Sequence, residues 1–287
     1  MFSLHYDLFL FRRLQQQWFS SSWNLIAWPI DLVRRWHGAD RVRQALGEWE
    51  SVKPKSHLHI TSDAPSIEIH TLQWPDADPR LADHQQRIFD AFNLPLNRHV
   101  CRIDHGLWLN AVLEQATAQV VMFVDNDCIP LQKGVVERAA HFAHEERSFV
   151  GVAQCSNHIP GAAGVFAAPA FLAVSPRAWH NLGRPDMRAN RRCDVAEELS
   201  RAAEAAGLKY QAIHPTSFER AGQWGVYALG AYGPYGIGTV FGGCIFHLYE
   251  GRSRQNVDLF VQQCQTVIAS QQGHETNFVM ACDSQWW

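Results

Sequence analysis

The feature that most constrains the fold is an almost continuously apolar run, Gln-Val-Val-Met-Phe-Val, at residues 119–124. Continuous apolar strands are typical of parallel sheets whose two faces are both covered by helices. From about His57 onward, short strand patterns also alternate with helical ones, as expected for βαβ units. We therefore predict an α/β fold with a mostly parallel central sheet flanked by helices.

The predicted elements follow from apolar periodicity and from turn residues. Strands are expected at residues 57–62, 67–73, 98–103, 119–124, 149–154, 165–174 and 208–213. Helices are expected after residue 79 and at residues 106–118, 131–145, 194–206 and 256–269. Gly207 suits the position that follows a helix, and residues 239–248 are expected to return the chain to the core.

The sequence divides into three parts by composition. Residues 1–55 mix aromatic residues with arginines, residues 56–270 carry the α/β pattern, and the tail at 271–287 begins with polar residues. The first part is predicted to be a helical appendage. Basic amphipathic helices can also lie on membrane surfaces, so a peripheral contact with the inner face of a membrane stays open beside packing on the main domain.

Composition excludes several classes of protein. The 287 residues carry a formal net charge of −3, which argues against a general nucleic-acid binder. No apolar run reaches the ~18 residues of a membrane span. The seven cysteines are widely spread and form no CxxC pair, which disfavours a zinc site or a disulfide framework. Reduced thiols in a cytoplasmic protein are the simplest interpretation.

The apolar strand ends in Asp125-Asn126-Asp127. Side chains two residues apart on a strand project to the same side, and two carboxylates there repel each other unless a cation lies near them. Ligands of open α/β sheets bind at the carboxyl ends of strands, and oxygen ligands suit Mg²⁺ or Mn²⁺. A divalent ion between these carboxylates and a diphosphate is thus one interpretation. The other is a polar turn in which Asn126 or Asp127 caps the next helix.

The order of Gly106, Asn110, the apolar strand and Asp125-Asn126-Asp127 resembles the GT-A glycosyltransferases, and glycosyltransferase family 2 in particular. The resemblance is firm over about residues 98–145. It implies a GT-A-like sheet, a nucleotide-diphosphate sugar donor and a saccharide or other hydroxyl acceptor. It also implies Asp125 near the ribose and the metal, and Asp127 as a metal ligand.

Further site residues follow from the same resemblance. The residues expected to contact the nucleotide-sugar are Asp76, Asp104, Asn110, Asp125 and Arg252. The consecutive acidic pair followed by Gly-Ser that is usual in the family is absent around Asp76. His247, at the end of the last core strand, resembles the family's late metal ligand; the alternative is a histidine at the edge of the core beside a solvated basic turn.

An inverting transferase needs a general base for the acceptor hydroxyl. The resemblance points to Asp194, which comes before a predicted helix and has Glu197 and Glu198 as neighbours. Asp194 and Glu197 also have the form of a helix capping box, and the two roles are compatible. A glycine-rich stretch at residues 222–243, with Trp224, Tyr227, Tyr232 and Tyr235 between its glycines, is predicted to be a long loop. It could close over the donor or stack against an acceptor, or it could be an exposed surface segment.

These features and the resemblance together predict a metal-dependent glycosyltransferase, and the resemblance alone implies that it acts with inversion. A haloacid-dehalogenase-type phosphatase also places DxD after an apolar strand, but that motif normally opens its domain. A sugar nucleotidyltransferase lacks support because no glycine-rich, arginine-bearing loop follows the first strand. A catalytically inactive GT-A-like binding module stays open as a non-enzymatic alternative.

Overall fold

The computed structural model describes residues 64–156, 164–223, 225–229 and 233–272. The predicted appendage at 1–55, the strand at 57–62 and all but the first two residues of the tail lie outside these ranges. Within the described ranges, no helix combines the length and the apolarity that a bilayer crossing requires.

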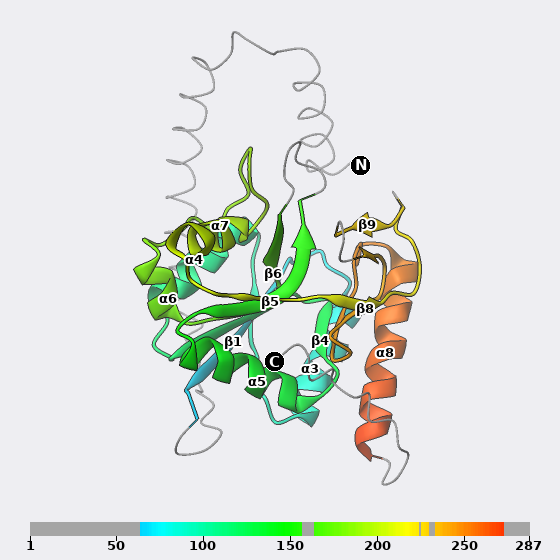
Figure 1. Cartoon of the computed structure of the whole chain (residues 1–287). Coiled ribbons are helices and arrows are strands. Elements are labelled where there is room, and N and C mark those ends of the chain that lie inside the picture. The colour runs from blue at the N-terminus through cyan, green and yellow to red at the C-terminus, as the bar shows by residue number, and fades with distance from the viewer. Residues whose placement is uncertain (1–63, 157–163, 224, 230–232, 273–287) are drawn as a thin grey trace. The chain divides into compact units, whose positions relative to one another are not determined.

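The central sheet has six strands and confirms the predicted α/β architecture (Figure 1). Their spatial order is β2 (Asn97–Val100), β1 (Ile67–Gln73), β3 (Val120–Val124), β6 (Val165–Val174), β5 (Phe149–Cys155) and β7 (Gln211–Ile213). The pairs β1–β2, β1–β3 and β5–β7 are parallel, whereas β6 runs antiparallel to both of its neighbours. Five of the six strands therefore share one direction, and their carboxyl ends meet at one edge.

A second, four-stranded sheet was not predicted. It is antiparallel, in the order β4 (Cys128–Pro130), β12 (Ile245–His247), β11 (Thr239–Phe241) and β8 (Pro215–Ser217). The predicted single segment at 239–248 is in fact a hairpin. The chain reverses at Gly242 and Gly243, whose φ angles of 55° and 67° lie in the left-handed region that glycine adopts readily.

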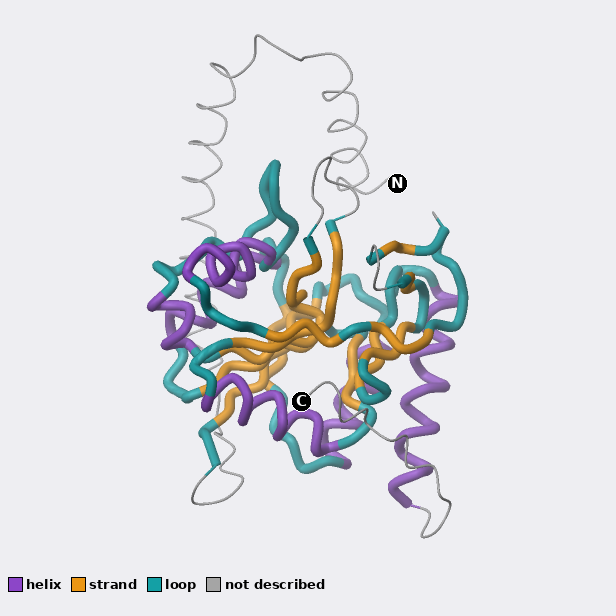
Figure 2. The backbone as a smooth tube through the Cα atoms, in the orientation of Figure 1, coloured by secondary structure: helices purple, strands orange, loops and turns teal. Residues whose placement is uncertain are grey.

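Helices cover both faces of the central sheet. In the view of Figures 1 and 2, α5 (Lys133–Glu145) lies below the strands, whereas α4 (His105–Gln115) and α7 (Glu197–Ala206) lie above them. The short helix α6 (Pro176–Asn181) contacts α4. The helices α3 (Pro79–Ala91) and α8 (Arg254–Gln272) pack against each other beside β4.

The two faces of β3 explain its unbroken apolar sequence. Val120, Met122 and Val124 belong to the main core that α5 closes. Phe123 points to the other face, where its ring contacts Trp108 of α4 at 5.4 Å between centroids. All five residues of β3 are buried. Because side chains alternate along a strand, Asp125 is expected on the α4 side, as Phe123 is.

The short helix α6 was not predicted, and several predicted elements differ at their ends. The helix predicted at 106–118 ends at Gln115, and the helix predicted from Asp194 begins at Glu197. Gly207 has a φ of 68° after α7, as predicted. Part of the predicted glycine-rich loop is a small antiparallel ribbon, in which β9 (Tyr227–Ala228) pairs with β10 (Pro234–Tyr235).

Candidate metal centre

The carboxyl edge of the central sheet gathers most of the predicted site residues. The segment after β1 contains Asp76, the segment after β2 contains Asp104, and the segment after β3 contains Asp125 and Asp127. These segments are distant in the sequence and meet because the strands are parallel neighbours. This edge is where open α/β sheets bind ligands.

Asp125, Asp127 and His247 form a compact group. Each offers one ligand atom, and these atoms all lie within 4.8 Å of one another. His247 Nε2 lies 3.4 Å from Asp127 Oδ1 and 4.0 Å from Asp125 Oδ2. The His247 side chain is buried, and both carboxylates are partly exposed, so the group can be reached from solvent.

The small second sheet brings His247 to the carboxylates. In the β4–β12 pair, His247 lies opposite Cys128, the residue that follows Asp127. The backbone N–H of Leu248 then donates to the carbonyl of Asp127 at 2.9 Å. Two residues about 120 positions apart in the sequence are thus held side by side by a backbone ladder, a contact that does not depend on an ion.

Asp125 lies between two imidazoles. Its Oδ1 is 3.4 Å from Nε2 of His105, the first residue of α4, as the side-chain alternation along β3 predicts. Burial raises the pKa of Asp125; the two histidines oppose this and the charge of Asp127 adds to it. Burial would lower the pKa of His247, but its hydrogen bond to Asp127 and the charges of both carboxylates outweigh burial and raise it. An added positive charge would therefore stabilise the two neighbouring carboxylates.

The residues fit a hard divalent cation. Two carboxylate oxygens and one imidazole nitrogen form a donor set that suits Mn²⁺ or Mg²⁺ with further positions left for water or phosphate. Gly251 also leaves room for Asp127, because a Cβ added at Gly251 would lie only 2.5 Å from Asp127 Oδ2. The chain passes too close to this carboxylate for any other residue to stand at 251 without displacing it.

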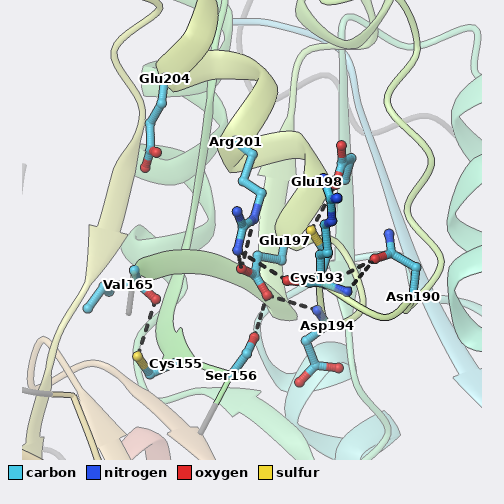
Figure 3. Close-up of polar contacts among 12 residues, drawn as sticks. Cys155, Ser156, Val165, Asn190, Cys193, Asp194, Glu197, Glu198, Arg201 and Glu204 are labelled. Carbon is cyan, nitrogen blue, oxygen red and sulfur yellow. Dashed lines mark hydrogen bonds and ion pairs between the residues drawn. The ribbon is translucent and has the colours of Figure 1, made fainter. Parts of the chain in front are cut away.

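Asp194 lies at the start of the segment that leads into α7 (Figure 3). Its Oδ2 accepts from Gln154 Nε2 of β5 at 3.3 Å, and its Oδ1 accepts from the Val195 N–H at 2.8 Å. The predicted capping box forms only in part. Glu197 Oε2 accepts from the Asp194 N–H at 2.8 Å, but the N-cap of α7 is Ala196, with a left-handed φ of 65°. The Asp194 side chain therefore does not cap the helix.

Glu197 holds this segment in place. Its carboxylate is almost fully buried and accepts from the hydroxyl of Ser156, from the Asp194 N–H and from Arg201 Nε and Nη2 (Figure 3). Ser156 follows directly after β5. Glu197 thus joins the carboxyl end of β5 to the segment that carries Asp194.

The other predicted contact residues have partners of their own. Asp76 pairs with Arg102 at 3.2 Å, where both side chains are exposed. Asp104 caps α4 by accepting from the Leu107 N–H at 3.0 Å. The guanidinium of Arg252 lies 5.0 Å from the ring centroid of Trp74, in the segment after β1. Arg252 therefore belongs to the same edge as the acidic group.

Asn110 joins α4 to a neighbouring segment. Its Nδ2 donates to Asp186 Oδ1 at 2.9 Å, and its Oδ1 accepts from the Met187 N–H at 3.0 Å. Gly106, one turn earlier, faces the same segment, since a Cβ there would lie 2.4 Å from Arg188 Cα. The Gly-Asn spacing is thus explained by close packing, and a contact of Asn110 with a nucleotide stays a prediction.

Three tyrosines connect the glycine-rich segment to the acidic group. Tyr227, Tyr235 and Tyr249 pack against one another, with ring centroids 4.9–5.6 Å apart. Tyr249 also meets the His247 imidazole edge-on at 4.2 Å. Trp224 and Tyr232 lie outside the described residues. Whether this segment closes over a ligand stays a prediction.

Sequence reasoning missed three residues of this site. His105 was detectable, because it follows a predicted strand at the edge where ligands bind. Gln85, whose side chain donates to the backbone carbonyls of Asp125 and Cys128, was detectable as a polar residue on the apolar face of α3. Gly251 gave no local signal, since the need for glycine there comes from a side chain more than 120 residues away.

No family model and no curated protein matches the sequence. Comparison with solved structures finds distant likenesses. The mannosyltransferase PcManGT from Pyrobaculum calidifontis, solved with GDP-Man and Mn²⁺, is 14% identical over 63% of this chain and 61% of that chain, with a TM-score of 0.38. The catalytic domain of Drosophila beta1,4galactosyltransferase 7, in complex with xylobiose, is 13% identical over 52% and 66%, with a TM-score of 0.34. A197 from STIV is 12% identical over 50% and 79%, with a TM-score of 0.32.

The chain spans less than two thirds of the first two of these structures. Likenesses this distant assign neither a family nor an activity.

Proposed function

We propose that this protein is a metal-dependent glycosyltransferase of the GT-A type, which moves a sugar from a nucleotide-diphosphate sugar to an acceptor hydroxyl with inversion. The observation that carries the proposal is the meeting of Asp125, Asp127 and His247 at the carboxyl edge of the sheet. The sequence resemblance to glycosyltransferase family 2 supports the reaction class, because it predicted this group from residues in two separate segments.

In this proposal, Asp125, Asp127 and His247 hold Mn²⁺ or Mg²⁺. The bound ion supplies positive charge opposite the departing nucleotide diphosphate, as a Lewis acid does. Arg252, held over Trp74 at the same edge, adds a second positive charge for the diphosphate. His105 orients Asp125 by facing its other carboxylate oxygen.

Asp194 acts in this proposal as the general base for the acceptor hydroxyl. Its two oxygens already accept from Gln154 and from the Val195 N–H, and Glu197 fixes its backbone. A base held by several partners loses little freedom when it meets its substrate, which favours proton transfer in a defined direction. Asp76, Asp104 and Asn110 complete the proposed contacts with the nucleotide-sugar.

The test is a thermal-shift screen of nucleotide-sugars with and without Mn²⁺, because a bound ligand raises the apparent stability by mass action. We expect stabilisation by one class of donor only when Mn²⁺ is present, and loss of that effect in Asp127→Ala. A donor shift that is unchanged in Asp127→Ala would contradict the assignment. Release of phosphate from p-nitrophenyl phosphate would instead favour a phosphatase.

Activity is then measured as release of nucleotide diphosphate from the donor that stabilises the protein. Metal-dependent turnover supports an active transferase, whereas donor binding without turnover favours the inactive binding module. Asp194→Asn is expected to abolish turnover while preserving the Mn²⁺-dependent donor shift. Wild-type turnover in Asp194→Asn would remove Asp194 from the mechanism.

A further inference from the structure

One fully buried polar side chain interrupts the apolar face of α3. Gln85 has no solvent exposure and lies among Leu81, Ile88 and Phe89, which are also buried. A buried amide is costly unless its donors and acceptor are satisfied. Gln85 is not a candidate metal ligand, and nothing in the sequence resemblance assigns it a role.

The amide group of Gln85 extends from α3 to the turn at residues 125–128. Its Nε2 donates to the carbonyl oxygen of Asp125 at 2.6 Å and to that of Cys128 at 2.8 Å. The Cys128 N–H also donates to the Asp125 carbonyl at 2.9 Å, which closes the turn. One side chain therefore holds both ends of the turn that carries Asp125 and Asp127.

Arg98 fixes the orientation of this amide. Its Nη2 donates to Gln85 Oε1 at 3.1 Å and to the carbonyl of Ala82 at 3.1 Å. In the opposite orientation, the amide oxygen would face two carbonyl oxygens and the amide nitrogen would face a guanidinium. Because both of these contacts would be repulsive, the Gln85 amide nitrogen faces the turn and donates to it.

We infer that Gln85 is a positioning residue for the metal centre, an inference that rests on the proposed function. It holds the backbone at 125–128 so that the two carboxylates stay in register with His247 across the β4–β12 pair. Metal centres tolerate only small errors in ligand position, about 0.2 Å in ligand distance. Partners that orient ligands typically change metal affinity by about 10- to 100-fold.

The experiment compares Mn²⁺ binding by the full chain in the wild type, Gln85→Met and Gln86→Met, using isothermal titration calorimetry. Methionine has nearly the length of glutamine but donates no hydrogen bond. Gln86 is the matched control, because it is the next residue on the same helix and bonds only to Asp90 among the described residues, at 2.9 Å. Thermal unfolding in EDTA measures the effect on the fold without an ion.

We expect Gln85→Met to weaken Mn²⁺ binding about 10- to 100-fold, with Gln86→Met within about twofold of the wild type. A folded Gln85→Met with wild-type Mn²⁺ affinity overturns the inference, even if its unfolding temperature in EDTA is lower, since the role would then be packing alone. If Gln85→Met does not fold, Gln85→Asn decides by the same measurement, because its shorter amide cannot reach both carbonyls.

The wild type separates this inference from the proposed function. Failure of the wild type to bind Mn²⁺ or Mg²⁺ overturns the metal centre and the role of Gln85 together. Binding by the wild type that Asp127→Ala abolishes and Gln85→Met leaves unchanged overturns only the role of Gln85.

Discussion

The substitution Gly251→Ala tests the metal centre without removing any proposed ligand. Gly251 has no left-handed φ, so its backbone accepts alanine. The added Cβ would lie 2.5 Å from Asp127 Oδ2, whereas ordinary contact begins at 3.4 Å. The carboxylate oxygen must therefore move by about 0.9 Å, several times the tolerance of about 0.2 Å for a metal–ligand distance. We expect Mn²⁺ affinity to fall about 10- to 100-fold, equivalent to about 1.4–2.7 kcal/mol.

The assay is calorimetric titration of Mn²⁺ into the full chain, with Gly164→Ala as the control. A Cβ added at Gly164 meets no atom of the described residues within 4 Å, and Gly164 has no left-handed φ. Thermal unfolding in EDTA should show both variants close to the wild type. Unchanged Mn²⁺ affinity in Gly251→Ala would refute the reasoning, because this displacement must weaken the binding of an ion that Asp127 holds in the observed geometry.

The other predictions concern single side chains. His247→Ala should weaken Mn²⁺ binding by at least about 10-fold in the same titration, and wild-type affinity would remove the imidazole from the ligand set. Gly106→Ala should lower the free energy of unfolding by about 1–3 kcal/mol in urea, because the new Cβ meets backbone atoms at 2.4 Å; a neutral effect would contradict the close packing. Asn110→Ala should lower the free energy of unfolding without donor by about 1–3 kcal/mol, since it removes the hydrogen bonds to Asp186 and Met187. A loss confined to donor binding would instead favour the nucleotide contact. Burial, aided by His70, lowers the pKa of His99 from 6.5 to about 3, so the unfolded chain binds the proton first and stability falls as the pH drops from 6.5 toward 3. At pH 4.5 this lowers the free energy of unfolding by on the order of 2–3 kcal/mol, and His99→Gln should abolish that decrease. An unaltered pH profile of urea unfolding in His99→Gln would contradict this.

The sequence alone was sufficient for the elements whose signals are local. The apolar run at β3 predicted a strand covered on both faces, and spacing on one face predicted α3, α4 and α5. Element ends were less accurate, as at the start of α7, because a side chain bond from Glu197 and a left-handed Ala196 delay the helix. The hairpin of β11 and β12 was missed because two adjacent glycines were interpreted as part of a longer loop.

The chemistry of the site divides in the same way. Residue type and position after a buried strand were enough to propose Asp125 and Asp127, and the resemblance added His247. Only the tertiary structure showed that the β4–β12 ladder brings His247 beside them, that Gln85 holds their backbone from α3, and that Gly251 must lack a side chain. Periodicity reports which face of an element is buried, since it arises from neighbours along one chain segment. Contacts between segments depend on strand order and register, which arise only when the whole core has packed.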